Sequence, residues 1–170
     1  MPVIELLQMK AALPSGGRLL GLDIGSKTIG LAISDSALKV AAPLTVFERG
    51  KFAADMARLQ ALITERAVGG LVAGLPIGLD GREGPRSQSV RQFAANLLKV
   101  IDLPLAFWDE RFSTIAAERP LREAEMSHRR RGAVVDKLAA AYLLQGALDR
   151  LASVPLTSSP SPPEPGRGSG

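Results

Sequence analysis

The stretch LLGLDIGSKTIGLAIS, residues 19–34, decides the fold class of this chain. It contains two short apolar runs, Leu19–Ile24 and Thr28–Ser34, which are separated only by Gly25, Ser26 and Lys27. Two apolar runs joined by a short turn that contains glycine are typical of a β-hairpin. We therefore expect the domain to begin with two antiparallel strands.

Strand-like and helix-like segments alternate downstream of this hairpin. Apolar residues that recur at helical spacing indicate amphipathic helices, and short apolar runs bounded by turn residues indicate strands. The expected elements are a strand over Leu44–Glu48 after a loop at Ala41–Pro43, a helix over Lys51–Arg66, a buried strand over Gly69–Leu75, a helix with Val90, Phe93, Leu97 and Leu98 on one face, a strand over Pro104–Trp108, a short helix between Ser113 and Met126, and a final helix over Ala133–Leu151.

The order of these elements, β-β-β-α-β-α-β-α, predicts an α/β domain with a mixed five-stranded sheet flanked by helices. In this topology the first strand is central, and the fourth and fifth strands lie beside it in turn. The final helix packs across that end of the sheet.

The chain has 170 residues, which is enough for one buried core and too few for two ordinary domains. Turn residues at 14–17 predict that an N-terminal extension, residues 1–17, is separate from the domain at 18–152. Residues 153–170 are rich in Pro, Ser and Gly and have almost no apolar side chains, so a disordered tail is expected there.

Composition excludes several classes of protein. With 0 cysteines and 1 histidine, disulfide frameworks, Cys-ligated zinc and His-rich metal sites are ruled out. No apolar run reaches the ~18 residues of a membrane span, and no basic and then apolar leader opens the chain. We therefore expect a cytoplasmic protein with no membrane partner. A net charge of +4 gives a mild preference for polyanions such as nucleic acids.

Asp23 lies within the first apolar run, where a carboxylate needs an explanation. Burying an unpaired carboxylate costs several kcal/mol, so Asp23 is expected to bind a partner or a metal. The alternative is that it accepts hydrogen bonds from turn N–H groups, as Asp next to Gly often does.

A second acidic site follows the fifth strand, where Asp109 and Glu110 precede Arg111. Strand alternation sends neighbouring side chains to opposite faces, so only one of the two acids is expected to join a given site. The other is then structural or pairs with Arg111. The alternative is that the segment is a polar strand exit, with Ser113 capping the next helix.

Asp136 in the final helix is the third candidate. Its neighbours at i+3, i+4 and i+7 are Ala139, Ala140 and Leu143, a small apolar face that suits close packing on a sheet. The alternative is that Asp136 lies in the first helical turn, where a carboxylate interacts favourably with the helix dipole.

The predicted topology brings these acids to one end of the sheet. Asp23 and the exit of the fifth strand are two strand spacings apart, ~10 Å, which two carboxylates and a pair of metal ions can bridge. Oxygen ligands without Cys or clustered His select Mg²⁺ or Mn²⁺. The sequence therefore predicts a divalent metal site.

Four stretches resemble the YqgF/RuvX family of Holliday-junction-resolvase-like nucleases in order and spacing, and the match runs from about Leu19 to Leu151. They are GLDIGSKTIG (21–30), GLPIGLDGREGPR (74–86), DERFST (109–114) and VDKLAAA (135–141). The resemblance implies an RNase H-like fold and, as catalytic and metal-binding residues, Asp23, Glu110 and Asp136.

The same resemblance implies hydrolysis of phosphodiester bonds, with maturation of the 5′ end of pre-16S rRNA as the expected function and junction-DNA resolution as the alternative. The local residues do not decide between RNA and junction DNA, or between endo- and exonucleolytic cleavage. They leave the oligomeric state open between monomer and homodimer.

Basic residues near these acids are candidates for contact with nucleic acid. The Gly-rich loop at 76–86 allows close approach of a phosphate, and a run of cations precedes Asp136. The alternative for both segments is that they are ordinary solvent-exposed surface. Phe107 and Trp108 are expected to belong to the core. The predicted nucleic-acid-binding residues are Lys27, Arg82, Arg86, Arg111, Arg129, Arg130 and Arg131.

Two rival functions remain. The segment from Asp23 to Gly30 also looks like the first phosphate motif of the actin, Hsp70 and sugar-kinase superfamily, but one domain offers no cleft between domains and no second motif is found. A non-catalytic nucleic-acid-binding module is the other rival. Three carboxylates argue against it, because they would face phosphates.

Overall fold

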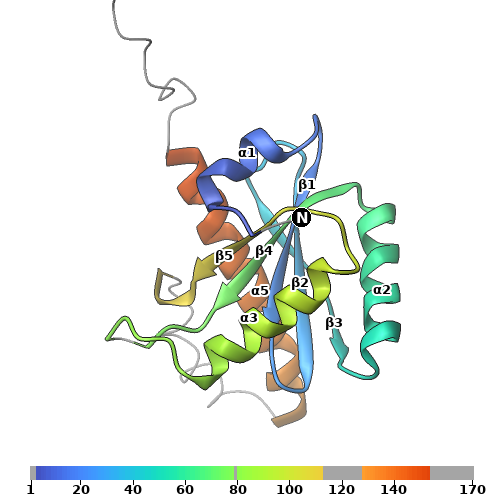
Figure 1. Cartoon of the computed structure of the whole chain (residues 1–170), viewed down its shortest axis with the longest axis vertical. Helices are drawn as coiled ribbons and strands as arrows, with labels where there is room; N and C mark the ends of the chain where they lie inside the picture. Colours follow the sequence, from blue (N-terminus) through green and yellow to red (C-terminus); the bar gives the residue numbers. More distant parts are fainter. Residues whose placement is uncertain (1–2, 79, 113–127, 154–170) are drawn as a thin grey trace, which may run out of the picture.

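The computed structural model describes residues 3–78, 80–112 and 128–153, and for residues 128–137 it describes the backbone alone. A single five-stranded sheet in the order β3-β2-β1-β4-β5 forms its centre. Helices cover both faces of this sheet (Figure 1). The predicted mixed five-stranded sheet, with the first strand central, is therefore confirmed.

The opening hairpin consists of β1 (Arg18–Ile24) and β2 (Thr28–Ser34), which pair antiparallel. The third strand, β3 (Ala41–Glu48), pairs antiparallel with β2. It begins at Ala41, so the predicted loop at Ala41–Pro43 is wrong. Pro43 is tolerated because β3 is an edge strand and its register with β2 shifts next to Pro43.

Two helices make the connections between the last three strands of the sheet. They are α2 (Phe52–Glu65), which leads from β3 to β4 (Val68–Leu75), and α3 (Pro85–Leu98), which leads from β4 to β5 (Leu105–Asp109). Both β1 and β5 pair parallel with β4. Every residue of β4 is buried, as its continuous apolar sequence predicts.

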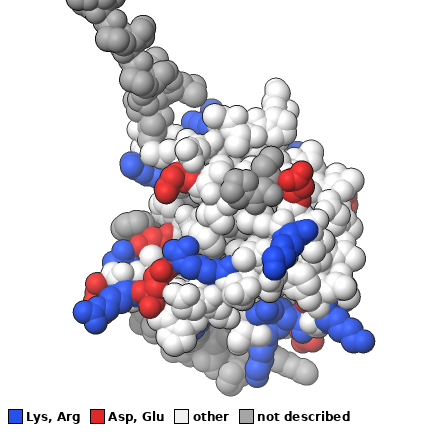
Figure 2. Space-filling view, in the orientation of Figure 1, with Lys and Arg blue, Asp and Glu red and all other residues white. Residues whose placement is uncertain are grey.

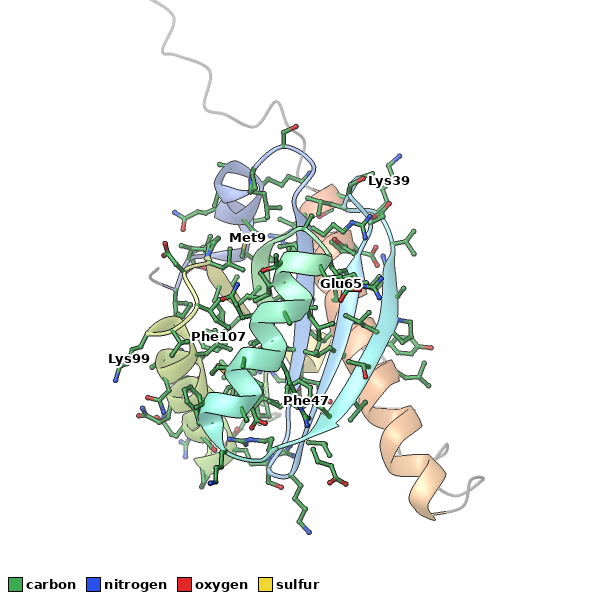
Figure 3. All side chains as sticks on the ribbon, turned by 90° about the vertical axis from the view of Figure 1, so that its right-hand side faces the viewer. Met9, Lys39, Phe47, Glu65, Lys99 and Phe107 are labelled. Carbon is green, nitrogen blue, oxygen red and sulfur yellow. The ribbon has the colours of Figure 1, made fainter. Side chains whose placement is uncertain are left out.

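The last helix, α5 (His128–Ser153), covers the opposite face from α2 and α3. Figure 3 shows α2 on the viewer's side of the sheet and α5 behind it. Each face has its own apolar core: Leu20, Leu22 and Leu71 pack toward α2 and α3, whereas Leu19 and Val72 pack toward α5. Side-chain alternation along β1 and β4 therefore decides which residues face α5.

The observed α5 starts five residues before the predicted Ala133. Gly132, which was expected to lie outside the helix, lies inside it. Glycine in a helix costs only about 1 kcal/mol, and the preceding His and Arg residues accept a helical backbone. The basic run at 128–131 therefore belongs to the first turn of α5 instead of preceding the helix. The predicted short helix between Ser113 and Met126 and the predicted tail, apart from Ser153, lie outside the described residues.

The N-terminal segment packs onto the sheet. A short 3-10 helix, η1 (Leu6–Gln8), and α1 (Met9–Ala12) lie over β4 and β5 on the α5 side, with Met9 fully buried. The N–H of Ile4 donates to the carbonyl of Leu105 at 2.9 Å. The segment that the turn residues separate from the domain thus adds to the same core, because its few apolar side chains cover the glycines of β4.

Among the described helices, none has the length and apolar character to cross a bilayer.

Candidate active site at the carboxyl end of β1, β4 and β5

Asp23 lies near the end of β1, on the face that α5 covers. A Cβ atom placed on Gly21 would lie 2.9 Å from Cβ of Leu144 and 3.2 Å from the carbonyl oxygen of Ala140, so Gly21 faces α5 closely. Asp23 is two residues further and shares that face because strand side chains alternate. It is partly buried, so its carboxylate lies at the rim of the α5 interface.

Glu110 is the first residue of the short helix η2 (Glu110–Phe112), directly after β5. Its side chain lies over Gly74: a Cβ on Gly74 would be 2.7 Å from Oε1 and 3.3 Å from Cγ of Glu110. The same position is 3.0 Å from Cδ2 of Leu143 in α5. Glu110 therefore occupies the space beneath α5 that a side chain at Gly74 would otherwise fill.

The strand register places Asp23 and Gly74 side by side. Leu22 of β1 is aligned with Ala73 of β4, so Asp23 and Gly74 are the next positions on these neighbouring strands. Adjacent strands are ~4.8 Å apart. The carboxylates of Asp23 and Glu110 are thus brought to one face and one end of the sheet, although 87 positions separate them in the printed sequence.

Asp109 is engaged elsewhere. Its carboxylate accepts hydrogen bonds from the Arg111 backbone N–H (2.9 Å), from Nε (3.0 and 3.1 Å) and from Nη2 (2.6 Å). Partial burial acts to raise the pKa of Asp109, but the hydrogen bonds and charge of Arg111 outweigh it and lower this pKa. The predicted pairing of one acid with Arg111 is confirmed, and Asp109 is that acid.

Arg111 was predicted to contact nucleic acid, and the structure commits its guanidinium first to Asp109. The hydrogen bond with Asp109 is the main reason that the pKa of Arg111 is raised, with a smaller contribution from the charge of Asp80. Its Nη1 lies 3.5 Å from a Cβ position at Gly81. Arg111 therefore connects the end of β5 with the loop that follows β4.

Asp136 lies in α5, one helical turn before Ala140, whose carbonyl oxygen faces Gly21. Because α5 runs antiparallel to β1 (Figure 1), a turn toward the start of α5 is a step toward the Asp23 end of β1. The side chain of Asp136 lies outside the described residues. Among the described side chains, no three His, Cys, Asp or Glu residues form a metal-binding group.

The Gly-rich loop between β4 and α3 is held by backbone hydrogen bonds among its described residues. Gly78 N–H donates to the carbonyl of Arg82 at 2.9 Å, and Gly81 adopts a φ of +81°, which favours glycine. The loop borders a hollow of about 470 Å³ to which Arg82 and Arg86 both contribute. The Arg82 side chain is 89% exposed, so it is accessible to a ligand.

The other predicted basic residues lie at the same end of the molecule. Lys27 is exposed in the β1–β2 turn, and Arg129, Arg130 and Arg131 lie in the first turn of α5, with side chains outside the described set. Phe107 and Trp108 belong to the cores, as expected: Phe107 packs with the α3 side, and the Trp108 ring lies 3.1 Å from a Cβ position at Gly146.

Two residues with a part in this geometry were not predicted from sequence. Gly74 makes room for Glu110, but no local pattern reveals that, because the contact depends on how β5 ends. Arg49 donates from Nη1 to the carbonyl of Gly25 at 2.7 Å and so holds the β1–β2 turn. Its position next to Gly50 and Lys51, between a strand and a helix, is a signal that could have identified it.

Comparison with known proteins agrees with this architecture. The model of the family described as "RuvX: Holliday junction resolvase" matches residues 17–150. A protein of Roseobacter denitrificans named "Putative pre-16S rRNA nuclease" is 59% identical over 143 residues, which is 83% of this chain and 88% of that protein. A protein of the same name from Paramagnetospirillum magneticum is 54% identical over 149 residues, or 88% and 96% of the two chains.

Among solved structures, T. thermophilus RuvC in complex with a Holliday junction substrate superposes with a TM-score of 0.50 at 14% identity, covering 81% of this chain and 98% of that one. This likeness identifies the fold as RNase H-like. The family model spans nearly the whole domain, and the relatives are matched over most of their length. This chain therefore belongs to the RuvX family of Holliday-junction-resolvase-like proteins.

Proposed function

We propose that this protein is a nuclease that hydrolyses phosphodiester bonds in the precursor of 16S rRNA and matures its 5′ end. The observation that carries the proposal is the placement of the Glu110 carboxylate over Gly74, beside Asp23 and beneath α5. The substrate comes from the relatives, which are named for pre-16S rRNA. A cytoplasmic location with nucleic acid as the partner follows from that substrate.

We assign Asp23, Glu110 and Asp136 as the residues that hold a divalent metal. The donor set fits a hard cation, because it offers carboxylate oxygens from β1, η2 and α5 and no sulfur ligand. Two carboxylates brought to one face and one end of the sheet also repel each other, and a cation between them relieves that repulsion. Mg²⁺ or Mn²⁺ bound there would activate the attacking water and stabilise the leaving oxygen.

The contribution of the protein's own residues is to position the carboxylates and the phosphates of the substrate. Asp23 extends from the central strand and the Glu110 side chain lies over Gly74, so both carboxylates are positioned before the substrate binds. Arg82 and Arg86 line the neighbouring hollow and would neutralise the phosphates that flank the reacting bond. Asp109 keeps Arg111 in place and takes no direct part.

Junction resolution is the second candidate, because the family is described by that activity. A four-way junction has two symmetric strands to cut, so resolution needs two copies of the site, whereas trimming one RNA end needs one. The two functions therefore differ in the oligomeric state that they require.

The test presents both substrates to the purified protein: a 5′-extended 16S precursor and a four-way DNA junction, each with Mg²⁺, Mn²⁺ or EDTA. We expect metal-dependent cleavage of the RNA precursor and loss of at least ~100-fold in Asp23→Asn and Glu110→Gln. Asp149→Asn is the control, since Asp149 lies near the far end of α5 and accepts a hydrogen bond from Gln145 that asparagine can also accept. Full activity of Asp23→Asn would contradict the proposal.

A further inference from the structure

A second basic surface lies where the β1–β2 turn meets the connection between β3 and α2. The Arg49 backbone N–H donates to the carbonyl of Lys27 at 2.8 Å, and Arg49 Nη1 donates to the carbonyl of Gly25 at 2.7 Å. Lys51, two residues after Arg49, precedes the first residue of α2. We refer to Lys27, Arg49 and Lys51 as the basic corner.

The backbone of the basic corner is held from two further directions. The Gly50 N–H donates to both carboxylate oxygens of Asp55, at 3.1 and 3.2 Å, and Asp55 is 4% exposed. The Arg49 guanidinium lies 4.8 Å from the ring centroid of Phe93 in α3. A corner fixed in this way loses little conformational entropy when a ligand binds.

The three cations of the basic corner differ in burial and therefore in role. Arg49 is partly buried and its guanidinium is used to hold the turn, whereas Lys27 and Lys51 are exposed. The ion pairs found among the described residues involve neither lysine. The acids nearest to Lys51 along the chain are Asp55, which is buried against Gly50, and Glu48, which is exposed, whereas the acid nearest to Lys27 is Asp23.

The corner lies at the same edge of the sheet as the carboxylates. Lys27 is four residues after Asp23, so their Cα atoms are at most ~14 Å apart. In Figure 1 the loop after β4, the β1–β2 turn and the β3–α2 connection follow one another along the lower edge of the molecule. Figure 2 shows Lys and Arg side chains gathered along that edge.

We propose that the basic corner binds the phosphate backbone of the substrate strand on one side of the carboxylates, while the loop at 76–86 binds it on the other. The inference rests on the proposed function for the nature of the strand. The exposed groups of the corner are ammonium groups, which suit contacts with phosphates, and phosphate contacts carry no base-sequence information. Lys27 and Lys51 make the contacts, and Arg49 is a positioning residue that holds the turn.

The test measures binding of a fluorescein-labelled single-stranded RNA by anisotropy, in EDTA so that nothing is cleaved, over a series of salt concentrations. Each phosphate contact to a single strand contributes about 0.7 to the slope of log K against log salt, or about fivefold in affinity at ~0.1 M salt. We expect Lys27→Gln/Lys51→Gln to bind about 25-fold more weakly and to reduce the slope by about 1.4.

The matched control is Lys39→Gln/Lys99→Gln, which removes the same charge from two exposed lysines outside the basic corner. Lys39 lies between β2 and β3, toward the top of Figure 3, and Lys99 follows α3; both are exposed. This variant should keep the affinity and the slope of the wild type. Thermal unfolding of both variants checks that they are folded.

The inference is overturned if the corner variant binds with the affinity and slope of the wild type, if the control loses as much, or if the wild type binds no RNA. Cleavage assayed in parallel separates the two proposals. If the wild type cleaves and the corner variant binds RNA normally, only the proposal about the basic corner is refuted. If the wild type binds RNA through the corner but cleaves neither substrate, the proposed nuclease function is refuted and the proposal about the basic corner stands.

Discussion

Replacing Gly74 by alanine would place a methyl group where the Glu110 carboxylate lies. The added Cβ would be 2.7 Å from Oε1 of Glu110 and 3.0 Å from Cδ2 of Leu143. Nonbonded heavy atoms are at their optimal separation near 3.5 Å, so the carboxylate has to move by about 0.8 Å. The main neighbour is the end of a flexible side chain, so most of the strain is relieved by moving Glu110.

The expected result is a loss of activity without a matching loss of stability. Displacement of a positioned group by about 1 Å costs up to ~100-fold in rate, so cleavage should fall by roughly 10- to 100-fold, or about 1.4–2.7 kcal/mol of transition-state stabilisation. The free energy of unfolding should change by less than ~1.5 kcal/mol. Cleavage rates and urea unfolding of the same preparations provide both numbers.

Gly70→Ala is the matched control. Gly70 is on the same strand and the same face, and its added Cβ would be 2.7 Å from Sδ of Met9, so the steric conflict is at least as severe. That conflict involves the N-terminal segment and leaves Glu110 untouched. Wild-type cleavage by Gly74→Ala, or equal losses in the two variants, would refute the assignment of Glu110.

Three further predictions concern the contacts that stabilise the fold. Gly21→Ala places a Cβ 2.9 Å from Cβ of Leu144, where no flexible end can give way, so α5 has to shift; urea unfolding should show a loss of about 1–3 kcal/mol together with lower cleavage, and unchanged stability would count against it. Met9→Ala removes a fully buried side chain, and calorimetry should show a loss of about 2–5 kcal/mol; less than 1 would mean that the N-terminal segment is not part of the core. Hydrogen bonds from the backbone N–H of Val40 and then of Lys39 lower the pKa of Asp35, so its stabilisation is present above the ordinary Asp pKa and is lost as pH falls through the lowered one. Asp35→Asn should therefore be less stable than the wild type at pH 7, and the difference should shrink toward pH 2.5; a constant difference would be inconsistent.

The fold could be predicted from sequence because its signals are local. The apolar runs on either side of Gly25 specify the hairpin, and the continuous apolar sequence of β4 specifies a strand buried on both faces. The boundaries of β3 and α5 were predicted less well, since Pro43 and Gly132 look like breaks in sequence and are tolerated by an edge strand and a long helix.

The choice between Asp109 and Glu110 could not be made from sequence. Alternation shows only that the two acids point to opposite faces, and the face of each depends on how β5 ends. The chain turns into η2 at Glu110, which brings that side chain back over Gly74 and leaves Asp109 to Arg111. The space over Gly74 that Glu110 occupies and the contact by which Arg49 holds the β1–β2 turn depend on residues far apart in the sequence. A local sequence pattern does not encode such contacts.

Binding of Mn²⁺ tests most directly whether the carboxylates of β1, η2 and α5 form one metal site. Electron paramagnetic resonance counts free Mn²⁺ as it is titrated into the wild type and into single variants. Asp23→Asn, Glu110→Gln and Asp136→Asn should each weaken binding by at least ~10-fold, as loss of a ligand should cost no less than loss of a group that supports one. Asp109→Asn should bind as the wild type does. Wild-type affinity in all three ligand variants would contradict the account.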